Sequence, residues 1–353
     1  MLARIAIVTA PGIGKIAIEE LVFKKIPYAD AITLPLKTQE VTLFNIKNEH
    51  IKNLFSLRTV EDIFIILFEG VDIKKKKDLI RLIQNNLKDN ILSKLTYLPA
   101  KKKKTTTNFW VFVKQDNDRF VHRGDISDII SNYISKYFKK WIKREPADVE
   151  LWAFYAKQKV TLGIRLTKIS FRQRKYKEIE RSGSLRPTLA SALILLSNPK
   201  PDDYFIDPMC GVGTILIERS FWGPTTFIGG GDIDERAVEI AKDNTKSINT
   251  HIMIDCWDST IFSALKDHHG KVNKIVTNIP FGKKFGEKKE LKLLYTKALN
   301  CWYKVLSTEG EIFLLTSQNK IIESVLKEIA MNYKKIHSFS VQGIYSTVYK
   351  IIK

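Results

Sequence analysis

Apolar residues along the first half of the chain fall into short runs and spaced stripes that predict mixed α/β structure. Continuous apolar runs at 4–9, 63–68 and 108–114 predict strands. Apolar residues at helical spacing over 16–23 predict a helix, and 73–98 reads as a lysine-rich helical region. We expect these strands to join into a sheet with helices packed against it.

The pattern then changes from one amphipathic helix to two alternating strands. One apolar stripe runs through 123–141 and predicts a helix, with Asp125 or Ser127 placed to cap its start. Residues 149–155 and 159–166 alternate between apolar and polar positions, which predicts two strands joined by a tight turn. With the strand before the helix, this order predicts an open sheet with a helix across one face.

The second half alternates strands and helices more regularly, as expected for an α/β domain around a parallel sheet. Helices are predicted over 188–196 and 235–246, and a closing hairpin surrounds Gly343, with strands at 333–339 and 345–352. The other predicted strands of this half are, in order, 203–207, 227–232, 251–254, 274–277 and 311–316.

A glycine turn follows the first strand of the second half, between Asp207 and a helix that starts at Thr214. Gly211 and Gly213 allow positive φ and a close approach of the backbone to a ligand. A strand, a tight loop and a helix start form the usual seat of a nucleotide-like ligand, although a plain turn has the same spacing. Leu216 replaces the third glycine of the dinucleotide fingerprint, and Asp207 suits a cationic or amine-bearing ligand better than a pyrophosphate. The loop therefore favours S-adenosylmethionine over NAD.

Acidic residues stand at the ends of the next two strands. Asp232 ends the second strand and can accept hydrogen bonds from ribose hydroxyls. Asp234 is better placed to cap the following helix. Asp258 follows the third strand, where it can accept from an adenine amino group or cap the segment after it.

The fourth strand ends in a second candidate motif, Asn278-Ile279-Pro280-Phe281-Gly282. An exocyclic base amine is a poor nucleophile because its lone pair is delocalised into the ring. The Asn278 side-chain carbonyl and the Ile279 backbone carbonyl can accept its two hydrogens, and Phe281 can stack on an extruded base. Pro280 fixes the turn, and no metal or covalent nucleophile is required. Asn and Pro are also common in ordinary turns.

Composition and charge narrow the class of protein. The chain has 353 residues, enough for two or three domains, and no apolar run approaches a membrane span. The first residues lack the features of a signal peptide. Cys210, Cys256 and Cys301 lie far apart, so we expect no disulfide framework and no metal site, and a reducing cytoplasm fits. The net charge of +20 indicates a polyanionic partner such as nucleic acid, or reflects a Lys-rich and Ile-rich composition.

The N-terminal half resembles the RNA-binding half of tRNA-modifying enzymes. The block 108–168 resembles a THUMP domain in its strand NFWVFVK, in Arg123 before a helix, and in the strand that ends LGIRLT. Residues 1–60, with PGIGKIAIEEL, resemble the ferredoxin-like segment that precedes a THUMP domain. The resemblance implies four parts: a ferredoxin-like segment at 1–60, a THUMP-like domain at 61–168, a basic linker at 169–186, and a catalytic domain at 187–353.

The C-terminal half resembles the catalytic domain of THUMP-linked guanosine-N2 methyltransferases, with a Rossmann-like sheet of seven strands and a closing antiparallel hairpin. The motifs that carry the resemblance are LRPTLA from Leu185, DPMCGVGTI from Asp207, GDID from Gly231 and NIPFG from Asn278. It implies that Asn278, Ile279, Pro280 and Phe281 hold the target guanine. It also implies that S-adenosylmethionine is bound by Arg186, Pro187, Thr188, Asp207, Met209, Cys210, Gly211, Gly213, Thr214, Asp232, Ile233 and Asp258.

The motifs and the resemblance together predict an S-adenosylmethionine-dependent RNA methyltransferase. The resemblance implies that it forms N2-methylguanosine, most simply at position 6 in the tRNA acceptor stem. Another RNA, such as an snRNA or rRNA, is the alternative substrate, and some eukaryotic relatives need a small activator subunit. A DNA adenine-N6 methyltransferase and a non-catalytic RNA-binding protein are the rival classes. Ile279 stands where many base methyltransferases have proline. Lys283, Lys284, Lys288 and Lys289 either contact phosphates beside the motif or form a solvated loop.

Overall fold

The computed structural model forms two compact units, Met1–Phe171 and Arg172–Lys353, and each is described by itself. Residues 98–105 and parts of the predicted linker at 169–186 lie outside the described residues. The structure describes residues 2–97, 106–116, 120–168, 171–174, 176, 181, 183–281 and 288–353.

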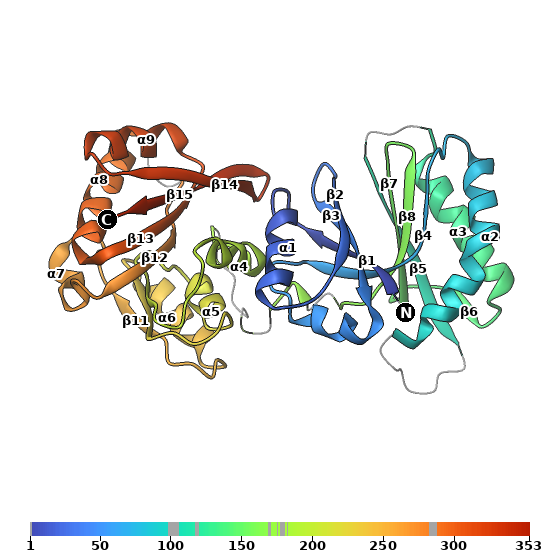
Figure 1. Ribbon diagram of the computed structural model, residues 1–353, viewed down its shortest axis with the longest axis horizontal. Coiled ribbons are helices and arrows are strands. Elements are labelled where there is room, and N and C mark those ends of the chain that lie inside the picture. Colours follow the sequence, from blue (N-terminus) through green and yellow to red (C-terminus); the bar gives the residue numbers. More distant parts are fainter. Residues whose placement is uncertain are drawn as a thin grey trace. The chain divides into compact units, whose positions relative to one another are not determined.

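The N-terminal unit is built on an eight-stranded sheet in the order β2-β3-β1-β4-β8-β7-β5-β6 (Figure 1). Neighbouring strands are antiparallel except that β5 pairs in parallel with β6 and β7. The sheet is continuous across the expected boundary at residue 60, because β1 pairs with β4 and β4 with β8. The strands are β1 Leu2–Thr9, β2 Ala29–Pro35, β3 Glu40–Lys47, β4 Asp62–Gly70, β5 Thr107–Gln115, β6 Trp141–Lys143, β7 Val149–Ala156 and β8 Lys159–Arg165.

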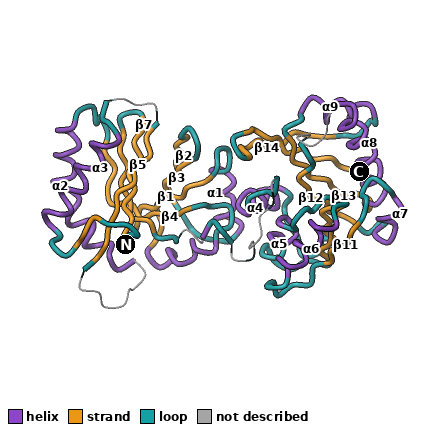
Figure 2. The backbone as a smooth tube through the Cα atoms, turned by 180° about the vertical axis from the view of Figure 1, so that it is seen from behind, coloured by secondary structure: helices purple, strands orange, loops and turns teal. Residues whose placement is uncertain are grey.

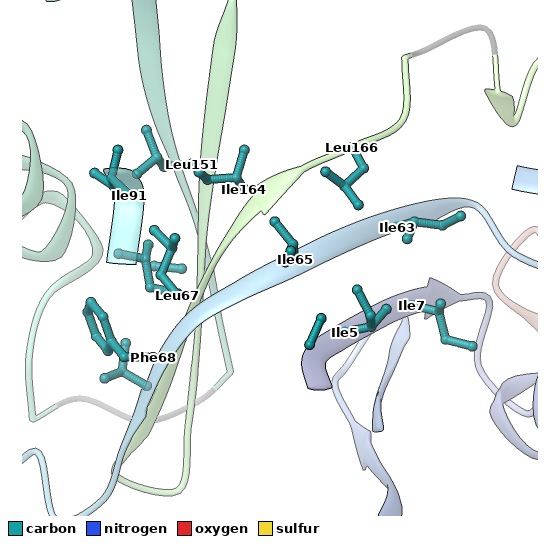
Figure 3. Packing of buried hydrophobic residues seen from close by; sticks show 14 of the residues in the cluster. Ile5, Ile7, Ile63, Ile65, Leu67, Phe68, Ile91, Leu151, Ile164 and Leu166 are labelled. Atoms are coloured by element: carbon teal, nitrogen blue, oxygen red, sulfur yellow. The ribbon is translucent and has the colours of Figure 1, made fainter. Parts of the chain in front are cut away.

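Helices pack against one face of this sheet, with α2 and α3 side by side on β4 and β5 (Figures 1 and 2). The main core lies between them and contains the residues labelled in Figure 3, among them Ile5, Ile63, Ile91 and Leu151. Ala6 and Val8 belong to a smaller cluster of buried residues, so successive residues of β1 point alternately into two clusters. Because both faces of the strand are buried, its sequence is one apolar run. The helices are α1 Gly14–Phe23, α2 Lys76–Lys94 and α3 Arg123–Tyr137, with short 3₁₀ segments at Asn48–Ser56 and Leu95–Tyr97.

The helix predicted over 123–141 is too long, and both predicted caps are wrong. Helix α3 ends at Tyr137, and His122 is its N-cap without a side-chain hydrogen bond. Asp125 forms an ion pair with Lys76 at 2.9 Å, and the Ser127 hydroxyl donates to the Val111 carbonyl at 3.4 Å. Trp141 instead begins β6, because the edge of β5 offers unpaired backbone groups to this segment.

The C-terminal unit is built on a Rossmann-like sheet of seven strands, as predicted, and their order is β11-β10-β9-β12-β13-β15-β14. Strands β9 to β13 are parallel to one another, and β15 pairs antiparallel with both β13 and β14. The third strand lies two residues later than the predicted 251–254. The strands are β9 Tyr204–Asp207, β10 Phe227–Asp232, β11 Met253–Cys256, β12 Val272–Asn278, β13 Leu306–Thr316, β14 Tyr333–Val341 and β15 Ile344–Ile352.

Helices lie along this second sheet. Helix α4 packs on α5, and α5 and α6 contact β10. Helices α8 and α9 pack together over a core that includes Trp302, Ile312 and Tyr349. Within the described ranges, no helix is both long and apolar enough to cross a membrane. The helices are α4 Pro187–Leu196, α5 Thr214–Arg219, α6 Glu235–Thr245, α7 Phe262–Leu265, α8 Lys288–Val305 and α9 Asn319–Glu328, with a 3₁₀ turn at Lys266–His268.

The order of the strands creates a switch point beside β9. The chain moves outward from β9 to β10 and β11, then returns to place β12 on the other side of β9. Ligands in open α/β sheets bind outside the carboxyl ends of the strands at such a point. The carboxyl ends of β9, β10 and β12 carry Asp207, Asp232 and Asn278.

Candidate functional site

Backbone N–H groups of the glycine loop after β9 bond to the residues around it. The Met209 N–H donates to the Asp207 carboxylate at 3.2 Å, and the Cys210 N–H donates to the Gly231 carbonyl at 2.9 Å. Gly211 and Gly213 have φ values of 53° and 79°, as the sequence predicted. A Cβ at Gly213 would lie 3.2 Å from the Ala241 Cβ. Positive φ and close packing therefore both require glycine at Gly213.

Four further predicted residues lie at the starts of α4 and α5. Gly213 is the N-cap of this helix, and Thr214 is its buried first residue, with its hydroxyl 3.5 Å from that of Ser184. Pro187 and Thr188 begin α4 and are buried, while Arg186 is the exposed N-cap of that helix. Because α4 packs on α5, these residues lie near the start of the helix that follows the loop.

Asp207 is a buried acid at the end of β9. Its side chain is 1% exposed, and burial raises its pKa to about 7, with a further rise from the nearby Asp232 and an opposing hydrogen bond from the Met209 N–H. A buried carboxyl with a raised pKa gains most from a cationic partner, because that partner restores the charged form. Burial likewise raises the pKa of the Cys210 thiol, so this cysteine is not a reactive thiolate.

Asp232 connects the loop to β10. Its carboxylate accepts hydrogen bonds from the Gly211 N–H at 2.9 Å and from the Asp234 N–H at 3.1 Å. Four lone-pair positions leave room for further donors such as ribose hydroxyls. Ile233 beside it is 70% exposed, and Asp234 caps α6 through a hydrogen bond from the Ala237 N–H at 3.2 Å.

Asp258 caps the segment that follows it, which is one of the two roles that the sequence left open. Its carboxylate accepts from the Thr260 N–H at 2.9 Å and from the Thr260 hydroxyl at 2.7 Å. The residue before it, Trp257, donates its backbone N–H to the Asp232 carbonyl and its indole N–H to the Pro208 carbonyl, both at 3.1 Å. Trp257 therefore ties the ends of β9, β10 and β11 together, although the sequence analysis did not select it.

The second motif begins at the last residue of β12. Lys274 and Ile275 of β12 pair with Phe205 and Ile206 of β9, so Asn278 lies just beyond the level of Asp207 on the neighbouring strand. The side-chain oxygen of Asn278 is buried and has no hydrogen-bond partner among the residues that the structure describes. Buried polar atoms are rarely left unpaired, and an unpaired acceptor here is suited to an incoming N–H donor.

The contacts of Ile279 account for an isoleucine at this position, where many base methyltransferases have proline. Its side chain is 2% exposed and belongs to the core under α8. Its N–H donates to the Leu315 carbonyl at 3.3 Å. Proline could not form this bond, because it has no N–H.

Two residues that the sequence analysis missed hold the rest of the motif. The Tyr295 hydroxyl of α8 donates to the Pro280 carbonyl at 2.6 Å. The Gln318 side chain, which follows β13, donates to the Phe281 carbonyl at 2.7 Å. The position of Gln318 just after the carboxyl end of a strand was the one available signal for it.

Only two of the four lysines after the motif belong to the described residues. Gly282, Lys283 and Lys284 lie outside the described residues. Lys288 and Lys289 are exposed in the first turn of α8. Across the described ranges, no group of three or more His, Cys, Asp or Glu side chains could hold a metal ion.

Comparison with known proteins gives similar relatives for more than half of the chain. The chain is 31% identical over 218 residues to the bovine tRNA (guanine(6)-N(2))-methyltransferase THUMP3, which covers 57% of this chain and 42% of that protein. It is 31% identical over 180 residues to the human U6 snRNA (guanine-N(2))-methyltransferase THUMPD2, which covers 50% of this chain and 34% of that protein. The matched region thus spans less than half the length of these relatives.

A solved structure resembles the chain along nearly its whole length. The crystal structure of TrmN from Thermus thermophilus matches with a TM-score of 0.80 and 21% identity, over 99% of each chain. This likeness confirms the fold. Residues 174–348 match the family model of the RMKL-like methyltransferase domain. The C-terminal unit is therefore an RMKL-like methyltransferase domain.

Proposed function

We propose that the chain is an S-adenosylmethionine-dependent RNA methyltransferase that forms N2-methylguanosine in tRNA, at position 6 of the acceptor stem. The observation that carries the proposal is the buried Asn278 side-chain oxygen at the carboxyl end of β12, next to the strand that ends at Asp207. This oxygen has no hydrogen-bond partner in the part of the chain that the structure describes. The family match and the names of the similar relatives support the same reaction.

The residues at the ends of β9 and β10 fit the proposed cofactor. S-adenosylmethionine carries a positively charged sulfonium and an ammonium group, and when bound it supplies an electrophilic methyl group. Asp207 offers a buried carboxyl whose raised pKa would fall beside a cation. Asp232 offers acceptor positions beyond its two backbone bonds. Gly211 and Gly213, in the loop after Asp207, have no side chains to block access. Asp258 is the proposed adenine contact.

The Asn278 motif would prepare the target amine. The Asn278 side-chain carbonyl and the Ile279 backbone carbonyl would accept the two N–H groups of the guanine amine, which favours a pyramidal nitrogen with its lone pair free for methyl transfer. Phe281 would stack on the extruded base. Positioning and preorganised hydrogen bonds supply most of the rate in such a site, and solvent takes the proton that the product loses.

The N-terminal unit would bind the RNA. We propose that residues 1–60 and 61–168 act together, since their strands share one sheet, and that a basic linker at 169–186 leads to the methyltransferase domain at 187–353. The net charge of +20 supports a polyanionic substrate. A-form RNA is recognised mainly by shape, ends and phosphate contacts, so a basic module can select the site.

Another RNA is the second candidate substrate, because the similar human protein THUMPD2 is named as a U6 snRNA methyltransferase. For either RNA, a small activator subunit is the proposed protein partner. A mixture of the purified chain with cell extract would reveal such a subunit through an increase in activity beyond that of either alone.

The direct test of the motif is the Asn278→Ala variant. We expect its turnover number to fall by roughly a hundredfold or more, while its Kd for RNA changes less than about twofold. Asn249→Ala, at an exposed position, is the matched control and should retain full activity. A large loss of RNA affinity, or unchanged turnover, would contradict the proposed role of Asn278.

A further inference from the structure

The acceptor oxygens of the Asn278 motif differ in their hydrogen bonding. The Pro280 and Phe281 carbonyls each accept a hydrogen bond from a side chain outside the motif. The Asn278 side-chain oxygen has no partner within the described ranges. The two carbonyls that are tied down therefore follow directly after the two acceptors that the proposed reaction uses.

Tyr295 reaches the motif from the core of the C-terminal unit. Its side chain is 2% exposed and packs with Leu291, Leu299 and Ile279 in one buried cluster. Burial raises its pKa to about 12, so the hydroxyl remains a donor throughout the physiological range. Its 2.6 Å bond to the Pro280 carbonyl spans 15 residues of sequence, and it links α8 to the motif.

Gln318 reaches the motif from the end of β13. It occupies the N-cap of α9, but its side chain makes no cap hydrogen bond. Its backbone N–H donates to the Thr316 hydroxyl at 3.0 Å, and its side-chain amide reaches across 37 residues of sequence to the Phe281 carbonyl. The side chain thus stabilises the motif and not its own helix.

We propose that Tyr295 and Gln318 are positioning residues that clamp the backbone of Pro280 and Phe281 and so fix the two acceptors of the target amine. This inference rests on the proposed function. The clamp acts with the Ile279 N–H bond to Leu315, so three consecutive residues are each anchored by a residue outside the motif. The anchors come from α8 and from the end of β13. A base amine needs both acceptors in a fixed geometry, because small displacements of reacting groups cost large factors in rate.

The kinetic test removes each donor with little change in volume. Tyr295→Phe and Gln318→Met should each lower the turnover number by about tenfold, with KM for RNA and Kd for S-adenosylmethionine within about twofold of the wild type. Tyr303→Phe, which removes a hydroxyl from the same helix, is the control and should keep the wild-type rate. Unchanged turnover, or a loss confined to KM, would overturn the inference.

The double variant tests whether the two residues act as one clamp. If the loss of either hydrogen bond already releases the motif, the second loss adds little. The variant with both Tyr295→Phe and Gln318→Met should then have about the same turnover number as the slower single variant. Multiplied losses would show two independent contacts and would contradict a shared clamp.

An activity-independent measurement separates this inference from the proposed reaction. Hydrogen exchange of a peptide that contains residues 278–281 should quicken in both single variants, while peptides from β9 keep their wild-type rates. Unchanged exchange in 278–281 would overturn the clamp, whatever the substrate. If the wild-type chain methylates no guanosine but exchange still quickens, the proposed function fails and the clamp remains.

Discussion

The Gly211 N–H donates a hydrogen bond of 2.9 Å to the Asp232 carboxylate, which joins the glycine loop after β9 to the end of β10. The same carboxylate accepts from the Asp234 N–H at the start of α6. Asp232 therefore shapes the loop, in addition to its proposed role as an acceptor for the cofactor. The two roles can be separated by a pair of substitutions.

Asp232→Ala should weaken S-adenosylmethionine binding by roughly a hundredfold, because it removes both the ligand acceptors and the anchor of the loop. Asp232→Asn keeps one oxygen for the Gly211 N–H and should weaken binding by about tenfold. Isothermal titration calorimetry measures both, with Asp243→Ala on the exposed side of α6 as control. Equal affinity in the alanine variant and the wild type would exclude Asp232 from the cofactor site.

Asp207 should make the cofactor-free protein less stable as the pH rises. Its folded pKa of about 7 lies above the ordinary value of 3.8, so the folded state binds the proton more tightly than the unfolded state. The stabilisation is complete below about pH 4 and is lost as the pH rises toward 7, by a total on the order of 4 kcal/mol. Asp207→Asn, which removes the charge, should therefore melt higher than the wild type at pH 8, with the difference shrinking toward pH 5.

The same substitution should abolish thermal stabilisation by S-adenosylmethionine, which the wild type should show increasingly as the pH rises through 7. Differential scanning fluorimetry with and without cofactor checks both effects. A wild-type response to cofactor that does not depend on pH, or an asparagine variant that still responds, would contradict this role of Asp207.

Ile279→Pro should destabilise the C-terminal unit by about 2 to 4 kcal/mol, because it deletes a buried side chain and leaves the Leu315 carbonyl without its donor. Ile279→Val keeps the N–H and should cost only about 1 kcal/mol. Urea unfolding followed by tryptophan fluorescence gives the comparison. If the proline variant is as stable as the valine variant, the hydrogen bond to Leu315 contributes little.

Cys256 should react with thiol reagents much faster than the other two cysteines. It is exposed at the end of β11, whereas Cys210 and Cys301 are buried and burial raises the pKa of each thiol. Cys256 pairs in register with Asp232, so bound S-adenosylmethionine should slow its labelling. Mass spectrometry after a brief maleimide pulse locates the adduct, and Cys256→Ser is the control. Rapid labelling of Cys210 would contradict the described burial of the loop.

The sequence predicted the parts of the site that are contiguous in the chain. Asp207, Gly211 and Gly213 follow one another within a strand, loop and helix, and the alternation of strands and helices places Asp232 and Asn278 at the same edge of the sheet. Local spacing and chain order carry that information. The seven-stranded sheet with its closing hairpin was predictable for the same reason.

Features that depend on distant pairing were not predictable. Strand β2 is mostly exposed, so it lacks an apolar pattern, and it is held by β3. The predicted helix before β6 ran on to Trp141 because no local signal shows that β5 has a free edge. Tyr295 and Gln318 lie 15 and 37 residues from the carbonyls they contact, and only the packing of α8 and β13 brings them there.

The most direct test of the account is methyl transfer by the purified wild-type chain from tritium-labelled S-adenosylmethionine to total small RNA, followed by nucleoside analysis. The account predicts label in N2-methylguanosine, recovered from tRNA, and none in the Asn278→Ala reaction. Label in another nucleoside would contradict the assigned target amine. Absence of both label and cofactor binding would contradict the proposed enzyme altogether.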